Sequence, residues 1–291
     1  MSEEHDEIEL AETKVVEVRD ENETEPHSPQ SAPAKKKKKL SKAGVMLFRV
    51  ILAVSIAVAA YSGFQLYKGL KDYRESENTY SALATETSTE KQETVAEDTG
   101  TTYTYDKANF TALAEINPDV AGWLSLENTV INYPVVQGTD NEYYLEHLFT
   151  RETNHTGCIF VDYRNAKDFS DRNTAMYAHH MRNGSMFAEL EGYREQDYYE
   201  THKELILQTP SGVYLIQPFS GLLADGYTDY VQFDFPTDES FMTYVNDLIA
   251  KSTFKSDVTV TAEDRIVTMS TCRYDVTNGR YAVFGKLVKI D

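Results

Sequence analysis

The chain has 291 residues, 41% of them hydrophobic, and a formal net charge of −19 at pH 7. That length can hold one sizeable domain with additional segments. The strongly acidic balance repels polyanions and argues against a nucleic-acid partner. The two cysteines, Cys158 and Cys272, lie far apart and form no Cys-x-x-Cys pair, so a structural zinc site is not expected.

The N-terminal tail, residues 1–43, is expected to be disordered and cytoplasmic. Its first 34 residues are rich in Asp and Glu, contain one Lys (Lys14) and one Arg (Arg19), and are nearly free of aromatics. Such a segment cannot bury enough apolar surface to offset the loss of chain entropy. A run of lysines, residues 35–39, follows immediately before an apolar stretch.

Residues 44–67, GVMLFRVILAVSIAVAAYSGFQLY, are expected to form a transmembrane anchor. About 20 helical residues cross the apolar core of a bilayer, and Arg49 lies close enough to the lysine end to reach the headgroups. A buried core helix would be shorter and striped, and a cleaved signal peptide rarely follows so long a polar tail. Because the lysines precede the span, the positive-inside rule predicts a single pass with the N-terminus cytoplasmic and the rest outside.

The next segment, residues 68–102, is rich in Thr, Ser, Glu and Ala and is expected to be an extracellular stalk, partly helical at first and flexible later. The folded domain is expected to cover residues 103–291. Phe110, Leu113 and Ile116 recur at helical spacing before Pro118 ends the pattern.

Most of the remaining chain shows β-strand patterns. The expected strand segments are residues 122–137, split around Glu127-Asn128, and then 157–165, 174–180, 204–223 with a turn at 210–212, 258–272 and 279–290. Two helices interrupt them, at residues 141–149 and at 237–254, the second capped by Thr237 or Asp238. About eight short strands with few helices predict a mostly β fold, a closed and mainly antiparallel barrel. The strand order does not follow from these patterns.

Cys272, at the end of a β-like run, has several interpretations. A disulfide with Cys158 fits an oxidising compartment, and Cys158 is equally well explained as a small buried residue. A nucleophilic role requires a partner that favours the thiolate and a donor for the charge that develops on the substrate. His179 and His180, at the end of a strand, and Arg280, at the start of the last strand, are candidates for these tasks.

Several motifs resemble those of the sortases, membrane-anchored cysteine transpeptidases of Gram-positive bacteria. The segment TMSTC, residues 268–272, is similar to the family's TLxTC signature, with Met269 in place of Leu. The segment YAHHMRNGSMF, residues 177–187, resembles the class B histidine loop YGHNMxxGSMF, with Ala178 for Gly and His180 for Asn. Residues 116–149 and the segment GCIFVDYRN, residues 157–165, are also similar to class B, with Cys158 where Ser is commoner. The resemblance covers roughly residues 109–291.

The resemblance implies an eight-stranded sortase-type barrel and assigns roles within it. Cys272 is the expected nucleophile, His179 the general acid and base, and Arg280 the donor to the oxyanion or the substrate. Ser270 and Thr271 are expected to line the substrate groove. Of the remaining candidates, one is read as a loop side chain (His180), two as strand packing (Thr268 and Met269) and one as either a loop carboxylate or an orienter of the histidine (Asp275).

The implied activity is cleavage of a C-terminal sorting signal of the NPxTN or LPxTG kind after Thr, through a thioacyl intermediate, with transfer to a cell-wall amine. The expected partners are a secreted protein that bears the signal, a peptidoglycan precursor and the membrane, and no cofactor or metal is expected. One alternative is a class B enzyme that joins pilins through a lysine acceptor. Another is a membrane-tethered binding module without activity.

Overall fold

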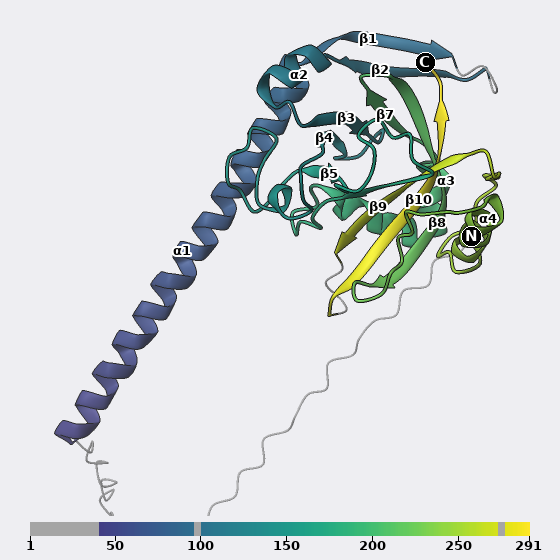
Figure 1. The fold of residues 1–291 in the computed structure, drawn as a ribbon. Coiled ribbons are helices and arrows are strands. Elements are labelled where there is room, and N and C mark those ends of the chain that lie inside the picture. The colour runs from purple at the N-terminus through teal and green to yellow at the C-terminus, as the bar shows by residue number, and fades with distance from the viewer. Residues whose placement is uncertain (1–40, 96–99, 273–276) are drawn as a thin grey trace, which may run out of the picture. The chain divides into compact units, whose positions relative to one another are not determined.

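Eight strands close into a barrel in the order β10-β8-β7-β3-β4-β5-β6-β9 (Figure 1). The structure is a computed structural model that describes residues 41–95, 100–272 and 277–291. The barrel strands are β3 (Val120–Ser125), β4 (Asn132–Val136), β5 (Ile159–Val161), β6 (Asn173–Tyr177), β7 (Leu205–Thr209), β8 (Gly212–Asp225), β9 (Arg265–Cys272) and β10 (Gly279–Lys289). The pairings β4–β5 and β6–β9 are parallel and the others antiparallel. The expectation of a closed, mostly antiparallel barrel of eight strands is confirmed.

Buried apolar side chains from the strands form the main core cluster of the barrel. Fully buried examples from five strands are Leu124, Val135, Ile159, Met176 and Val283. Each such side chain contributes about 1.5–3 kcal/mol by leaving water. The interior is therefore a packed core, and the chemistry must lie at the strand ends.

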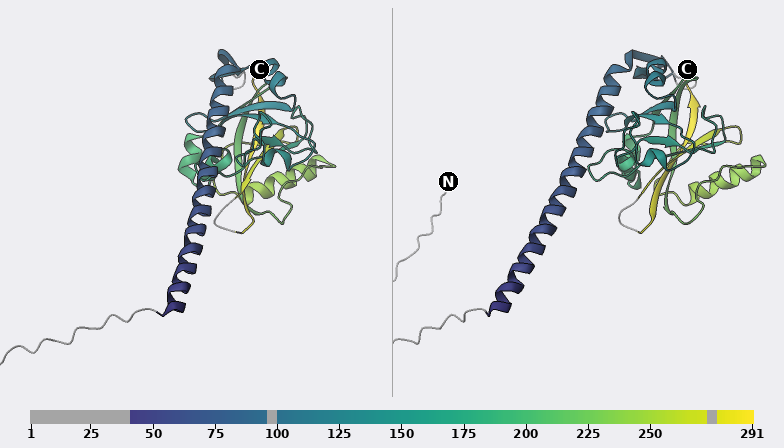
Figure 2. Two further views of the ribbon diagram at one scale, coloured as in Figure 1. Left: turned by 90° about the vertical axis from the view of Figure 1, so that its left-hand side faces the viewer. Right: turned by 60° about the vertical axis from the view of Figure 1, so that its left-hand side comes forward.

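The helix α4 (Asp238–Ala250) covers the outside of the barrel. It begins with a capping box, in which Thr237 accepts a hydrogen bond from the Ser240 amide and Ser240 bonds back to the Thr237 amide. Phe241 and Val245 pack in one cluster with Phe219 of β8 and Phe284 of β10. Figure 2 shows α4 beside these strands. Thr237 thus serves as the N-cap, as the sequence predicted.

The long helix α1 (Lys42–Glu86) contains the expected apolar span. The chain divides into two units, residues 1–57 and 58–291. Apolar side chains within 45–70, such as Met46, Ile56 and Leu66, are exposed, and α1 is long and apolar enough to cross a membrane. A large exposed apolar surface is unfavourable in water, so α1 is a candidate membrane span.

The prediction that the later part of the stalk is flexible is wrong for the residues that the structure describes. Within the second unit, α1 continues to Glu86 because Tyr80 and Leu83 bury their side chains in the barrel's core cluster. A hairpin of β1 (Ser88–Val95) and β2 (Thr102–Ala108) then follows, with backbone hydrogen bonds that composition did not reveal. This part of the chain is therefore tied to the barrel rather than free.

The expected helix at residues 141–149 is reduced to one short 3₁₀ turn, η1 (Tyr143–Leu145). The carbonyl of Tyr144 accepts a hydrogen bond from the Cys158 amide at 2.9 Å, and that of Glu146 accepts one from the Asn154 amide at 2.9 Å. An α-helix would need these carbonyls for its own ladder. Tertiary contacts therefore override the helical pattern here.

The remaining helices are short. The helix α2 (Phe110–Ile116) matches its prediction and is capped by Asn109, whose side chain accepts from the Ala112 amide at 3.1 Å. The elements η2 (Phe187–Arg194) and α3 (Gln196–Thr201) were not predicted. They follow the histidine loop and pack through buried Phe187, Leu190, Tyr193 and Tyr199.

Candidate active site

The parallel pairing of β6 with β9 brings the histidine loop to the end of the cysteine strand. Tyr177 is the register partner of Ser270, and one step further the hydroxyl of Thr271 donates to the Ala178 carbonyl at 3.0 Å. The offset in both contacts is 93 residues, which is also the separation of His179 and Cys272. In neighbouring parallel strands, residues at equal register lie side by side. His179 and Cys272 therefore emerge at the same edge of the barrel.

On the other side of β9, Arg280 is the direct antiparallel partner of Cys272. Directly opposed residues of an antiparallel pair point to the same face with their Cβ atoms about 4.5–5.5 Å apart. The cysteine thus lies between a histidine in the loop after β6 and an arginine of β10. The sequence predicted this set of residues but could not supply the register that joins them.

One groove, with a volume of about 310 Å³, contains all three side chains. Its lining comes from six parts of the barrel edge: Asn141, Leu145, Phe160, Tyr177, Ala178, His179, Tyr230, Ser270, Thr271, Cys272 and Arg280. Both residues expected to line a substrate groove, Ser270 and Thr271, are among them. The exposed part of this wall is mainly apolar, with a few polar groups, as is typical of ligand-binding sites.

The imidazole of His179 is oriented by the backbone of η1. Its Nε2 atom lies 2.8 Å from the carbonyl oxygen of Leu145. A carbonyl oxygen only accepts hydrogen bonds, so Nε2 carries a proton and Nδ1 is the nitrogen that can exchange one. The same backbone stretch that fails to form a helix therefore holds the candidate acid and base in one orientation.

His180 contacts the cysteine strand rather than only solvent. Its Nδ1 lies 3.2 Å from the Cys272 carbonyl oxygen and 4.0 Å from a carboxylate oxygen of Glu191. The sequence predicts only a loop side chain here, whereas this contact links the histidine loop to the backbone of the candidate nucleophile. Asp275, the possible orienter of His179, lies outside the described residues.

Tyr230, which the sequence reasoning missed, closes one side of the groove. Its hydroxyl lies 2.7 Å from Ser270 Oγ. Burial raises the pKa of Tyr230, while the bond to Ser270 and the charge of Arg280 act in the opposite direction. The aromatic stretch DGYTDYVQFDF, residues 225–235, was the only signal in the sequence that could have pointed to this loop.

Leu145, Asn141, Phe160 and Tyr177 were also given no role in the sequence reasoning. They lie in motifs that the sequence singled out, but as parts of an expected helix or strand. Thr268 and Met269 are fully buried, as expected of strand packing.

The two thiols are free and differ in environment. Cys272 is partly exposed and Cys158 is buried. The Cys158 thiol lies 3.6 Å from the Pro134 carbonyl oxygen, and burial raises its pKa to about 12. Cys158 is therefore a packing residue with an unreactive thiol. The structure describes both cysteines and contains no disulfide between them, so the disulfide alternative is wrong.

Comparisons with known proteins agree with this arrangement. A family model of the sortase domain matches residues 124–288. Sortase B of Staphylococcus aureus is 38% identical over 186 residues, covering 63% of this chain and 76% of the relative. Sortase B of Listeria monocytogenes is 32% identical over 256 residues, covering 83% of this chain and 97% of the relative.

Solved structures give the same result for the fold. A Staphylococcus aureus sortase B–substrate complex is similar with a TM-score of 0.61 at 38% identity, over 63% of this chain and 86% of the other. Sortase B from B. anthracis in complex with AAEK1 has a TM-score of 0.65 at 34% identity, over 76% of this chain and 99% of the other. The chain therefore belongs to the sortase family of cysteine transpeptidases, and its relatives are class B sortases.

Proposed function

We propose that this chain is a membrane-anchored transpeptidase that cleaves a C-terminal sorting signal of the NPxTN or LPxTG kind after Thr and joins the protein to a cell-wall amine. The observation that carries the proposal is the single groove in which Cys272 has Arg280 as its strand partner and shares the lining with His179. Relatives at 32% and 38% identity are sortase B proteins.

In the first half-reaction the Cys272 thiolate attacks the Thr carbonyl carbon of the signal. The negative charge that develops on the carbonyl oxygen is matched by the guanidinium of Arg280. The C–N bond then breaks, and the leaving amine takes a proton from His179. The product is a thioester between Cys272 and the secreted protein.

In the second half-reaction an acceptor amine attacks the thioester carbon and loses a proton to His179. The C–S bond breaks, an amide forms, and the Cys272 thiolate is restored. A solved sortase B structure is complexed with triglycine, which supports an amine of a cell-wall cross-bridge as the acceptor. The proposed topology places the groove outside the cell, where the secreted protein and the lipid-linked precursor meet.

The test is turnover by the full chain in detergent. It is incubated with a fluorogenic library of signal peptides, with triglycine as acceptor and a lysine peptide as the competing acceptor. We expect cleavage after Thr, a triglycine adduct, and a loss of more than about 1,000-fold in Cys272→Ala. No cleaved peptide, or unchanged turnover in Cys272→Ala, would falsify the proposal, and a preference for lysine would favour the pilin-joining alternative.

Topology needs a separate measurement. Protease added to intact cells should digest the barrel and leave the N-terminal tail intact. Clipping of the tail with an intact barrel would reverse the proposed orientation.

A further inference from the structure

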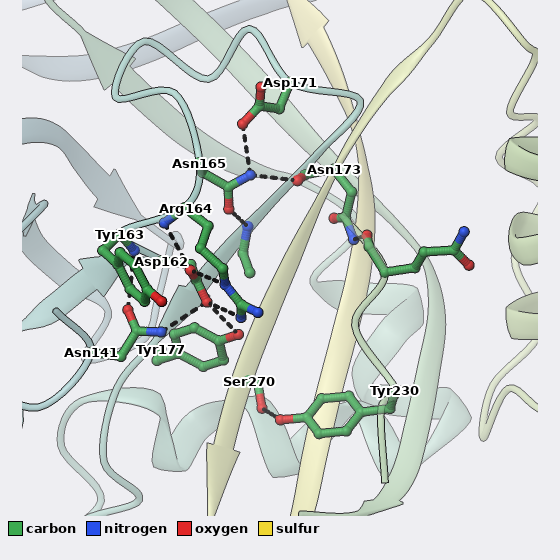
Figure 3. A network of polar contacts seen from close by, with 12 residues as sticks. Asn141, Asp162, Tyr163, Arg164, Asn165, Asp171, Asn173, Tyr177, Tyr230 and Ser270 are labelled. Atoms are coloured by element: carbon green, nitrogen blue, oxygen red, sulfur yellow. Dashed lines mark hydrogen bonds and ion pairs between the residues drawn. The ribbon is translucent and has the colours of Figure 1, made fainter. Parts of the chain in front are cut away.

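Asp162, directly after β5, is a buried carboxylate that the proposed chemistry does not use. Its side chain is 0% exposed. Figure 3 shows it at the centre of a polar network beside the groove, with Asn141, Arg164 and Tyr177 around it. A buried charge is costly unless its hydrogen bonds are satisfied, so its partners are the first question.

Two side chains and a backbone amide hold Asp162 in its ionised form. Arg164 donates from Nε to Oδ1 at 2.9 Å, from Nη2 to Oδ2 at 2.8 Å, and from its amide to Oδ1 at 3.0 Å. Burial raises the pKa of Asp162, but the hydrogen bonds from Arg164 and Asn141 outweigh it and leave the pKa below its usual range. Asp162 is therefore an anion that only accepts hydrogen bonds at neutral pH.

Asp162 Oδ2 also accepts hydrogen bonds from two residues that line the groove. The Asn141 amide donates to it at 2.9 Å and the Tyr177 hydroxyl at 3.2 Å. The other amide atom of Asn141, Oδ1, accepts from the Tyr163 backbone amide at 3.1 Å. Both ends of the Asn141 amide are therefore fixed, and the phenol of Tyr177 is held at its tip.

Arg164 extends the network to the segment that carries Tyr230. Its guanidinium lies over the Phe233 ring at 4.0 Å, a cation–π geometry. Phe233 lies three residues after Tyr230, whose hydroxyl is hydrogen-bonded to Ser270 in the groove wall. One carboxylate thus reaches three separate parts of the groove wall, at Asn141, at Tyr177 and, through Arg164, at the segment of Tyr230.

We propose that Asp162 is a positioning residue that sets the shape of the signal-binding groove by fixing Asn141, Tyr177 and, through Arg164, the segment that contains Tyr230. This role rests on the proposed function, because it assigns substrate recognition to that same groove. Asp162 touches none of the reacting groups. Its loss should therefore weaken binding of the signal peptide and leave the reactivity of Cys272 unchanged.

The experiment compares the full chain in detergent with its Asp162→Asn variant, which keeps the volume and removes the charge. We expect KM for the signal peptide to rise roughly tenfold, the size of one lost hydrogen bond to a charged group. We expect kcat to stay within about threefold. The rate at which iodoacetamide alkylates Cys272 should be unchanged, because this small reagent does not need the groove wall.

Two further variants keep the proposal falsifiable. Tyr177→Phe removes only the hydroxyl that reaches Asp162 and should also raise KM, and the double variant should raise KM no more than Asp162→Asn alone. Should Asp162→Asn fail to fold, an unchanged KM in Tyr177→Phe overturns the proposal. The matched control is Asp264→Asn. The Asp264 carboxylate lies 3.0 Å from Lys286 Nζ and does not line the groove, so this variant should leave KM unchanged.

The outcomes separate the positioning role from the activity. Turnover by the unmodified chain with an unchanged KM in Asp162→Asn overturns the positioning role alone. A parallel fall of kcat and of Cys272 alkylation also overturns it, since that result marks a general loss of structure. Absence of turnover in the unmodified chain removes the proposed function, and the positioning role with it.

Discussion

Gly157 is packed so closely against Leu145 that a Cβ atom on residue 157 would lie 2.7 Å from the Leu145 carbonyl oxygen. That oxygen is the acceptor that orients His179. Gly157 also has a φ of +65°, where an L side chain is strained. The absence of a side chain at one position therefore controls the orientation of the candidate acid and base.

Gly157→Ala should lower the free energy of unfolding by more than about 2 kcal/mol, because backbone strain and a backbone clash add. It should also lower kcat, since the Leu145 carbonyl must move. The control is Gly184→Ala, at φ +86° but with nothing within 4 Å of the added Cβ, where the loss should be about 1 kcal/mol. Equal losses in the two variants, measured by denaturant unfolding, would contradict the packing argument.

Arg280→Lys should lower kcat/KM for the signal peptide by about 100-fold or more. Lysine keeps the charge but loses the rigid fork of donors that suits an oxyanion beside Cys272. The measurement is steady-state cleavage of the signal peptide, with Cys272 alkylation as the control for an intact strand pair. A loss below about fivefold would mean that Arg280 supplies only charge.

Tyr80→Phe should lower the free energy of unfolding by about 1–3 kcal/mol. The Tyr80 hydroxyl donates to the Gly157 carbonyl at 2.6 Å in a buried position, and its loss leaves that carbonyl unpaired. Tyr227→Phe is the matched control, because Tyr227 is 83% exposed, and it should change little. An unchanged midpoint in denaturant for Tyr80→Phe would show that water replaces the hydroxyl.

The pH dependence of stability should carry the signature of Asp162. Its pKa is lowered in the folded chain, so its contribution is present above the unfolded value of about 3.9 and is lost as pH falls through the folded value. The difference in unfolding temperature between the unmodified chain and Asp162→Asn should therefore be constant from pH 7 to about pH 5 and shrink below about pH 4. A difference that grows as the pH falls would contradict this prediction, because it would mean that folding raises the pKa of Asp162 instead of lowering it.

Much of the barrel and the candidate residues could be predicted from the sequence, because these features depend on residues that are close together in the chain. Alternating strands, the Thr237 cap and the motifs around His179 and Cys272 need only neighbouring residues to be recognised. The register could not be predicted, since the pairing of β6 with β9 joins residues 93 positions apart.

The helix predicted at 141–149 and the flexible stalk predicted at β1 are wrong for the same physical reason. The 141–149 segment has helical spacing, but its carbonyls bond Cys158, His179 and Asn154 instead of their own helix. The strand β1 has no apolar alternation and is held by its partner β2. In each case distant groups, invisible to a local pattern, supply the hydrogen bonds that decide the conformation.

The parallel pairing of β6 with β9 also has a consequence for biogenesis. Contacts between residues far apart in sequence form late, because the intervening loop must first be closed. Cys272 meets His179 and Arg280 only after β9 has paired with both β6 and β10. A partly folded chain therefore holds all three side chains without the groove that they line, and this groove is complete only when the barrel closes.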